Sequence, residues 1–196
     1  VDGDTSTSDM LILLANGAVN DAVDGTVDGG MYGSVGGDPL DATDRAVFET
    51  ELRALCMELA MKIADDGEGA SHLITIDVSG CGNRQEAAKI AKTIAESPLV
   101  KTAIAGGDPN WGRIMCAAGY AGVDFDPMKS SLAINGIELF HAGRPLPFDE
   151  KVVAASIREN RDTHIDLRFG EGNASIRFWT CDLTREYVAI NADYTS

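Results

Sequence analysis

The stretch that decides the fold is residues 99–119, LVKTAIAGGDPNWGRIMCAAG. Its apolar opening, residues 99–105, predicts a short buried strand, and the two glycines that follow predict a sharp reversal because glycine accepts positive φ. Asp108 and Pro109 are residue types that begin helices, and Gly119 is typical of a left-handed helix end. A helix N-terminus at such a turn can hold an anion, but residue types alone favour a well-capped connection without a ligand.

The whole chain has the composition of a folded protein with a sizeable core. It contains 196 residues, of which 44% are hydrophobic, and its formal net charge is −15. The negative charge argues against binding to nucleic acid and to anionic membrane surfaces, since both select basic patches. No apolar run approaches the length needed to span a bilayer.

The cysteine pattern argues against metal and disulfide chemistry. Cys56, Cys81, Cys116 and Cys181 are far apart in the sequence, and none forms a Cys-x-x-Cys pair. We therefore expect neither a zinc site nor a disulfide framework, and free thiols suit a reducing cytoplasm.

The first half of the chain predicts a buried helix, a long loop and an amphipathic helix. Residues 10–15 are apolar on all sides, which predicts a fully buried helix. Residues 18–44 are rich in glycine without apolar periodicity, which predicts a flexible surface loop. Residues 48–63 repeat apolar side chains at a spacing of three to four, so we expect a helix lying on a sheet.

Later segments alternate between strand and helix patterns. Residues 73–78 predict a strand, and Asn83 with Glu86 predicts a capping box for the next helix, which Ser97-Pro98 ends. Beyond Pro127 we expect a hairpin with an Asn135-Gly136 turn and a helix capped by Asp149. Residues 165–169 and 175–180 predict two strands that pair antiparallel with each other.

Glu68 is the candidate ligand-binding carboxylate. Glycines flank it and would let the backbone approach a ligand, and a carboxylate there could bind the ammonium of an amino acid. Without further information an ordinary acidic turn residue is the better interpretation. Glu171 lies in a second Gly-Glu-Gly sequence, residues 170–172, which we interpret as a hairpin loop without a binding role.

Four segments in order resemble the ornithine acetyltransferases, the bifunctional glutamate N-acetyltransferases of arginine biosynthesis. The segment GDPNWGR (107–113) carries the first resemblance, and DGEGA (66–70) carries the second. The opening VDGDTST (1–7) with LLANG (13–17), and CDLT (181–184) with INADY (190–194), complete it. The resemblance identifies the chain as the C-terminal, or beta-chain, part of such a protein and covers its whole length except roughly residues 18–44.

The resemblance implies an α/β (α+β) fold: a layered sandwich of sheets and helices followed by a smaller α/β C-terminal domain. Residues 1–83 would complete the catalytic core domain, and residues 84–196 would form the C-terminal domain with a substrate-contacting tail. The opening polar segment would lie close to the active centre, although Ser8 stands where the family commonly has asparagine.

The resemblance also implies an activity, because the residues alone show no nucleophile with a base beside it. Family members cut themselves before a threonine, which then carries the acetyl group from N-acetyl-L-ornithine to L-glutamate. That catalytic threonine would lie upstream of Val1, so the fragment alone is expected to be inactive. No metal or organic cofactor is implied, and some members also use acetyl-coenzyme A. The expected partner is the alpha chain of the same precursor, in a heterotetramer of two alpha and two beta chains.

By position the family's substrate-binding residues correspond to Glu68, Asn191 and Ser196. The final hydroxyl residue is more often threonine, which serine replaces without loss of the hydroxyl. His72 stands where the family commonly has lysine, and at a strand start we expect it to be an edge residue rather than a catalyst.

Two other functions remain open from the sequence. The chain could belong to an N-terminal-nucleophile amidase or aminopeptidase of similar fold, or it could be a non-catalytic assembly domain. Acetyl exchange between ornithine and glutamate would indicate the acetyltransferase, whereas plain hydrolysis would indicate the amidase or aminopeptidase. Turnover by the intact precursor would exclude the non-catalytic assembly domain. The sequence also leaves open whether the amine substrate belongs to arginine or antibiotic biosynthesis.

Overall fold

The computed structural model describes residues 2–4, 10–14 and 41–193. These residues form two compact units: residues 2–4 with 57–193, and residues 10–14 with 41–56. Most of the loop predicted at 18–44, the position of Ser8, and the predicted substrate-binding residue Ser196 lie outside the described residues.

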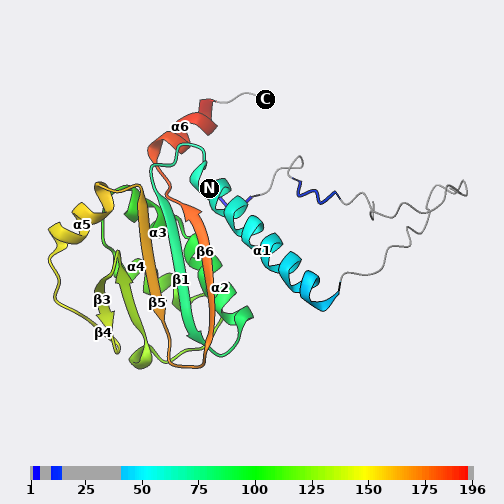
Figure 1. Ribbon diagram of the computed structural model, residues 1–196. Helices are drawn as coiled ribbons and strands as arrows, with labels where there is room; N and C mark the ends of the chain where they lie inside the picture. Colours follow the sequence, from blue (N-terminus) through cyan, green and yellow to red (C-terminus); the bar gives the residue numbers. More distant parts are fainter. Residues whose placement is uncertain (1, 5–9, 15–40, 194–196) are drawn as a thin grey trace, which may run out of the picture. The chain divides into compact units, whose positions relative to one another are not determined.

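Figure 1 shows the described helices and strands in chain order. They are α1 (Ala42–Asp65), β1 (Leu73–Cys81), α2 (Arg84–Ala95), α3 (Pro98–Ala105), α4 (Trp111–Gly119), the 3-10 helix η1 (Pro127–Lys129), β2 (Ser131–Ile134), β3 (Ile137–His141), β4 (Arg144–Pro145), α5 (Glu150–Arg158), β5 (Asp162–Arg168), β6 (Ala174–Cys181) and α6 (Arg185–Asp193).

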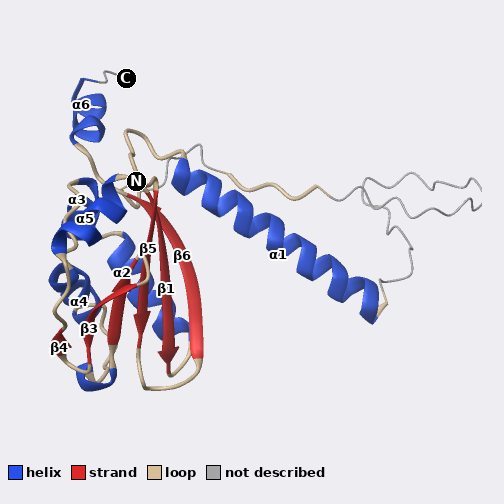
Figure 2. Cartoon of the chain, turned by 60° about the vertical axis from the view of Figure 1, so that its left-hand side comes forward, coloured by secondary structure: helices blue, strands red, loops and turns tan. Residues whose placement is uncertain are grey.

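The strands form one mixed sheet in the order β4-β3-β2-β5-β1-β6. Strands β1 and β5 are parallel, and every other neighbouring pair is antiparallel. Helices α2 and α4 lie on one side of the sheet in both ribbon views (Figures 1 and 2). The predicted α/β class is confirmed.

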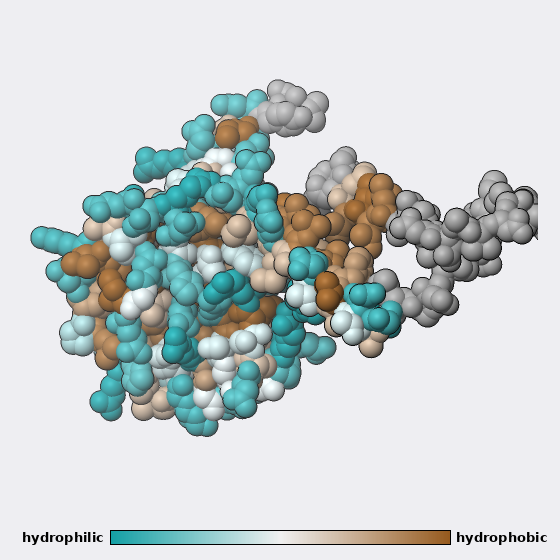
Figure 3. Space-filling view, in the orientation of Figure 1, coloured by the Kyte–Doolittle hydropathy of each residue, from teal (hydrophilic) through white to brown (hydrophobic). Residues whose placement is uncertain are grey.

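The alternation of apolar and polar residues along β1 explains why the sheet has one buried face. Ile74, Ile76 and Val78 are fully buried in the core, whereas Thr75 and Asp77 point to the opposite face and are only partly covered. Hydrophilic and neutral residues cover most of that opposite face in Figure 3. The central strand therefore joins an apolar layer under the helices to a polar surface.

Three local predictions are confirmed. Asn83 Oδ1 accepts a hydrogen bond from the Glu86 backbone N–H (2.9 Å), and Asn83 Nδ2 donates to Glu86 Oε1 (2.8 Å). Asp149 caps α5 by accepting from the Lys151 backbone N–H (2.9 Å). The turn of the β2–β3 hairpin has positive φ at Asn135 (49°) and Gly136 (79°), as a tight primed turn requires.

The strand predicted at residues 99–105 is wrong, because this segment is helix α3. Ser97 is its N-cap, accepting from the Val100 N–H, and Pro98 occupies its first turn. The Ser97-Pro98 pair therefore begins a helix, while α2 has already ended at Ala95. A fully apolar run of this length cannot distinguish strand from helix, and the capping residue decides.

The predicted cap of the following helix is also wrong by two residues. Asn110, not Asp108, caps α4 by accepting from the Arg113 N–H (3.1 Å). Gly107 makes the reversal with φ +63°, as predicted for this glycine pair. Gly119 is the last residue of α4 but does not have positive φ; the nearby left-handed glycine is Gly122.

The predicted pairing of the last two strands is wrong. Strand β1 lies between β5 and β6, pairing parallel with β5 and antiparallel with β6. Two antiparallel strands joined by a short loop usually form a hairpin, but here the β5–β6 connection passes over the end of β1. Glu171 therefore lies in a loop that crosses one strand rather than in a hairpin.

The N-terminal apolar segments differ from their predictions. Residues 10–14 are not helical and are exposed, so the predicted buried helix is wrong for this described part. The amphipathic helix is present as α1, but it has no buried residue; Phe48 is 49% exposed and Leu55 is 52% exposed. The predicted helix is thus confirmed as an element, and its position on a sheet remains a prediction.

The domain division at residues 83 and 84 remains a prediction. Strand β1, which precedes it, pairs with β5 and β6, which follow it. The sheet thus contains strands from both sides of the predicted boundary.

Candidate functional site

Glu68 lies in the turn that joins α1 to β1. The Ala70 backbone N–H donates to the Gly67 carbonyl oxygen (2.9 Å), which closes the turn. Gly69 has φ +67°, and a Cβ built on it would lie 2.6 Å from the backbone nitrogen of Tyr187 in α6. Only glycine allows this approach, so the turn and the first part of α6 are in direct backbone contact.

Asn191 lies on α6 and meets Glu68 directly. Its Nδ2 donates to Glu68 Oε2 (2.8 Å) and to the Tyr187 carbonyl oxygen (2.9 Å). The two side chains are 123 positions apart in the sequence, and both are exposed. Two of the three predicted site residues thus lie together on the surface, and the third, Ser196, lies outside the described residues.

Tyr187 connects the same helix to the opening of the chain. Its hydroxyl donates to Asp2 Oδ2 (2.6 Å), and the Asp4 backbone N–H donates to Asp2 Oδ1 (2.9 Å). These two hydrogen bonds, that from Tyr187 above all, lower the pKa of Asp2, and the interaction with Asp2 raises the pKa of Tyr187. Residues from the start, middle and end of the chain therefore meet around α6.

Sequence reasoning missed Tyr187 and Asp2 as individual members of this cluster. The spacing offered a signal for Tyr187, because it precedes Asn191 by four residues and so lies on the same face of a helix. Asp2 belongs to the opening polar segment, and the expectation that this segment lies close to the active centre remains a prediction. Nothing in the sequence pairs Asp2 with a tyrosine.

The C-terminal tail is attached to the sheet unit through its first residues. Asp182 is fully buried, and Thr184 Oγ1 donates to the Gly69 carbonyl oxygen (2.6 Å). Within the described part of α6 no residue is buried, and Val188 is 59% exposed. The tail is thus anchored at its base, and α6 presents its side chains to the surface.

His72 is not an edge residue as predicted. It is 7% exposed, precedes the central strand β1, and its Nδ1 lies 2.8 Å from Asp182 Oδ2. Its Nε2 lies 3.2 Å from the Ile157 carbonyl oxygen. Both ring nitrogens therefore have partners inside the protein.

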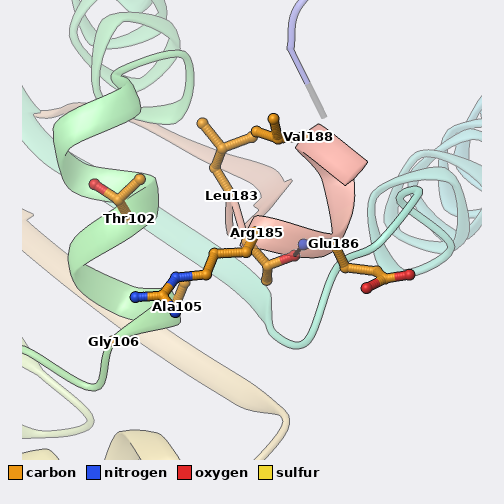
Figure 4. A pocket seen from close by; sticks show the side chains of 8 residues that line it. Thr102, Ala105, Gly106, Leu183, Arg185, Glu186 and Val188 are labelled. Atoms are coloured by element: carbon orange, nitrogen blue, oxygen red, sulfur yellow. Dashed lines mark hydrogen bonds between the residues drawn. The ribbon is translucent and has the colours of Figure 1, made fainter. Parts of the chain in front are cut away.

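A cavity of about 690 Å³ lies between the end of α3 and the base of α6 (Figure 4). Arg185 extends along it toward Gly106, whereas Glu186 points away in the same view. Its lining residues are Thr102, Ala105, Gly106, Leu183, Thr184, Arg185, Glu186 and Val188.

The glycine turn of residues 106–107 is covered by a side chain. Arg158 Nη2 donates to the Gly106 carbonyl oxygen (3.1 Å), and a Cβ on Gly107 would lie 2.4 Å from Arg158 Cγ. These contacts give the GDPNWGR segment a packing role between α3 and α5.

Three further observations concern residues 2–4, 10–14 and 41–193 and the cysteines among them. These residues contain no cluster of three or more histidine, cysteine or acidic side chains suited to a metal ion. Among their helices, none has the length and apolar character to cross a bilayer. The four cysteines are free thiols, with Cys81 and Cys181 buried.

Comparison with known proteins assigns the family. The ArgJ family model matches residues 1–196. The chain is 42% identical to the arginine biosynthesis bifunctional protein ArgJ, chloroplastic, of Sorghum bicolor, covering 100% of this chain and 40% of that protein. It is 41% identical to the arginine biosynthesis bifunctional protein ArgJ of Gloeobacter violaceus, again over 100% of this chain and 45% of the relative.

A solved structure agrees with these relatives. The crystal structure of the arginine biosynthesis bifunctional protein argJ from Bacillus halodurans matches with a TM-score of 0.84 and 40% identity, covering 99% of this chain and 84% of that chain. The chain spans less than half the length of these curated relatives. The family model, the sequence identities and the fold lead to one assignment: the chain belongs to the ArgJ family.

Proposed function

We propose that this chain supplies part of the amino-acid pocket of a glutamate N-acetyltransferase in arginine biosynthesis. The full protein would move the acetyl group of N-acetyl-L-ornithine to L-glutamate. The observation that carries the proposal is the 2.8 Å hydrogen bond from Asn191 Nδ2 to Glu68 Oε2. The family resemblance selects these two residues independently as substrate contacts, and they are hydrogen-bonded although 123 positions separate them in the sequence.

The reaction would take place in two acyl transfers. A threonine hydroxyl outside this chain attacks the acetyl carbonyl of N-acetylornithine, and the ornithine amine leaves with a proton. The acetyl-threonine is then attacked by the glutamate amine, which restores the hydroxyl and releases N-acetylglutamate. The freed amine of the threonine, produced by self-cleavage of the precursor, would act as the base.

Glu68 and Asn191 would recognise the substrate rather than react with it. A carboxylate attracts the ammonium group of an amino acid, and this attraction strengthens when the rest of the pocket excludes water. The Asn191 amide occupies one carboxylate oxygen, Oε2, and so fixes the orientation of the other. Ser196 would add a hydroxyl to the same pocket.

The remaining components follow from the family. The alpha chain of the same precursor would supply the threonine and the groups that stabilise the oxyanion, in a heterotetramer of two alpha and two beta chains. Acetyl-coenzyme A is a second acetyl donor to be tested. The four free thiols suit a cytoplasmic location.

The test is Glu68→Gln in the full-length protein, with N-acetylornithine and glutamate as substrates. Removing the charge while keeping the shape should lower kcat/KM for N-acetylornithine by about a hundredfold, the loss typical of a desolvated ion pair. Self-cleavage should proceed as in the wild type. The matched control is Glu171→Gln, the same change in the other Gly-Glu-Gly turn, which should leave the kinetics unchanged. Unchanged steady-state kinetics in Glu68→Gln would overturn the assignment.

The same preparation distinguishes the alternatives. An amidase or aminopeptidase would release free acetate or cleave a peptide without transferring an acetyl group to glutamate. A non-catalytic assembly domain would give no turnover in the intact protein. Acetylglutamate formation that depends on both substrates supports the proposed transfer and excludes both alternatives.

A further inference from the structure

A buried carboxylate lies at the base of the candidate site. Asp182 is fully buried between β6 and α6. Its Oδ1 accepts hydrogen bonds from the backbone N–H groups of Ser71 (2.8 Å) and His72 (3.1 Å). Its Oδ2 accepts from Ser71 Oγ (2.5 Å) and contacts His72 Nδ1 (2.8 Å). Burial opposes ionisation of Asp182, but the hydrogen bonds from Ser71 and His72 outweigh it and lower its pKa.

Serine, histidine and aspartate together resemble a nucleophilic triad, but their geometry does not suit one. In such a triad one imidazole nitrogen faces the carboxylate and the other faces the hydroxyl. Here His72 Nδ1 lies near both Asp182 Oδ2 and Ser71 Oγ (2.9 Å), while Nε2 is engaged with the Ile157 carbonyl oxygen. The Ser71 hydroxyl donates to the carboxylate, so no base is available to activate it.

The contacts of Asp182 instead join the two segments that carry the candidate site. Ser71 follows Glu68 by three residues, and Asp182 precedes Asn191 by nine. Thr184 Oγ1 adds a second connection by donating to the Gly69 carbonyl oxygen (2.6 Å). The segments that carry the exposed Glu68–Asn191 pair are therefore joined by hydrogen bonds to the buried Asp182 carboxylate.

Lys101, in α3, holds the end of β6 from the helical side of the sheet. Its Nζ donates to Thr180 Oγ1 (2.9 Å) and to the Cys181 carbonyl oxygen, and the residue is 2% exposed. Burial lowers the pKa of Lys101, against the opposing influence of Cys181, Asp182 and Asp2. The end of β6 is thus held on both sides immediately before the chain continues to α6.

We propose that Asp182, together with Ser71 and His72, is a positioning cluster that sets the distance between Glu68 and Asn191 and thereby the affinity for the amino-acid substrate. The inference rests on the proposed function, because it assigns these residues an effect through Glu68. The proposal assigns none of the three a contact with substrate.

The experiment measures KM and kcat of the full-length protein for N-acetylornithine. Asp182→Asn keeps the size of the side chain but can no longer accept all four hydrogen bonds, and Ser71→Ala removes a single one. We expect KM to rise about tenfold in Asp182→Asn and about threefold in Ser71→Ala, with kcat within about twofold of wild type. A merely structural role would lower the active fraction, and so kcat, without changing KM.

The matched control is Ser130→Ala. Ser130 is 1% exposed and its hydroxyl donates to the Asp126 carbonyl oxygen (3.1 Å), away from α6. Loss of this buried hydrogen bond should leave KM unchanged. A rise in KM in Ser130→Ala equal to that in Ser71→Ala would overturn the inference, because the loss of a serine hydroxyl away from the candidate site would then have the same effect.

Double variants with Glu68→Gln complete the test. If Asp182 acts through Glu68, adding Ser71→Ala or Asp182→Asn to Glu68→Gln should raise KM no further. Additive effects would overturn the positioning role while leaving the proposed function intact. If Glu68→Gln alone has normal kinetics, the proposed function itself fails and the inference fails with it. Should Asp182→Asn not fold, Ser71→Ala with its double variant decides the question.

Discussion

Two turns in this chain have the same tripeptide, Gly-Glu-Gly, at residues 67–69 and 170–172, and both precede a strand of the same sheet. Glu68 accepts a hydrogen bond from Asn191, far along the chain, on the surface beside α6. Glu171 accepts from the backbone N–H of Asp126 (3.2 Å) and lies 3.7 Å from Lys129 Nζ. The second glutamate thus joins its loop to the segment around η1, and the first meets a residue that the family resemblance places at the substrate.

The second glycine of each turn, Gly69 or Gly172, also packs against a different part of the chain. Gly69 has φ +67° and lies against the backbone of Tyr187, at the base of the candidate site. Gly172 is equally crowded, since its Cβ would lie 2.5 Å from the Cys81 carbonyl oxygen, but it packs the connection between two strands. The same local sequence therefore carries different roles, and the long-range partner determines which role each turn has.

The largest expected effect comes from Gly69→Ala compared with Gly172→Ala. Both changes introduce a Cβ against backbone atoms, and each should lower the free energy of unfolding by about 1–3 kcal/mol. Only Gly69→Ala should displace α6 from Glu68, so it should lower kcat/KM by more than about a hundredfold. Thermal unfolding and kinetics at a temperature where both variants are folded provide the measurement. Equal losses of activity in both variants would show that the two turns do not differ in role.

A smaller effect is expected from Asn191→Ala, which removes the hydrogen-bond partner of Glu68 and leaves the contacts of Glu171 intact. The variant loses the hydrogen bond to Glu68, so KM for N-acetylornithine should rise about tenfold. Helix stability should change little, because alanine favours helices. Asn191→Asp is the stricter companion: it keeps the shape but places a carboxylate against Glu68, and it should raise KM further. If Asn191→Asp binds substrate better than wild type, the pair does not work as proposed.

The smallest expected effect is a change in acid stability. The hydrogen bonds of Asp182 lower its pKa in the folded protein below the unfolded value, which is about 3.9. Its contribution to stability is therefore complete above about pH 4 and is lost as the pH falls through the folded-state pKa. Asp182→Asn should show a lower Tm at neutral pH and a weaker dependence of Tm on pH below about pH 4.

Gly172→Ala is the control for that measurement, because it destabilises the protein while keeping Asp182. Its Tm should be lower at every pH but should fall on acidification in parallel with the wild type. A parallel curve for Asp182→Asn as well would contradict the stabilising role of the ionised carboxylate.

The sequence predicted those elements whose signals are local. The Asn83–Glu86 capping box, the Asn135-Gly136 turn and the Asp149 cap all satisfy backbone groups within a few residues, so their residue types are sufficient. Residues 99–105 failed because an apolar run fits a strand and a buried helix equally well. There the decisive residue, Ser97, was assigned to the end of the preceding helix.

In the candidate site, too, the residues could be predicted but their long-range contacts could not. Glu68 and Asn191 could be named in advance through family motifs, but their hydrogen bond could not be derived from local pattern. His72 was expected at an edge, and only the structure shows it buried against Asp182. The strand order is a further example, since β1 separates two strands that are neighbours in the sequence.

By itself, then, the sequence determined the Asn83 and Asp149 caps, the Asn135-Gly136 turn, the alternation of β1 and the family. Tertiary structure alone decided which of two identical turns meets α6, which strands pair, and that a buried aspartate joins the segments carrying Glu68 and Asn191. The physical reason is the range of the interactions: a cap or a turn is satisfied by neighbouring residues, whereas a strand order or a buried carboxylate is satisfied by groups that only the folded chain brings within hydrogen-bond distance.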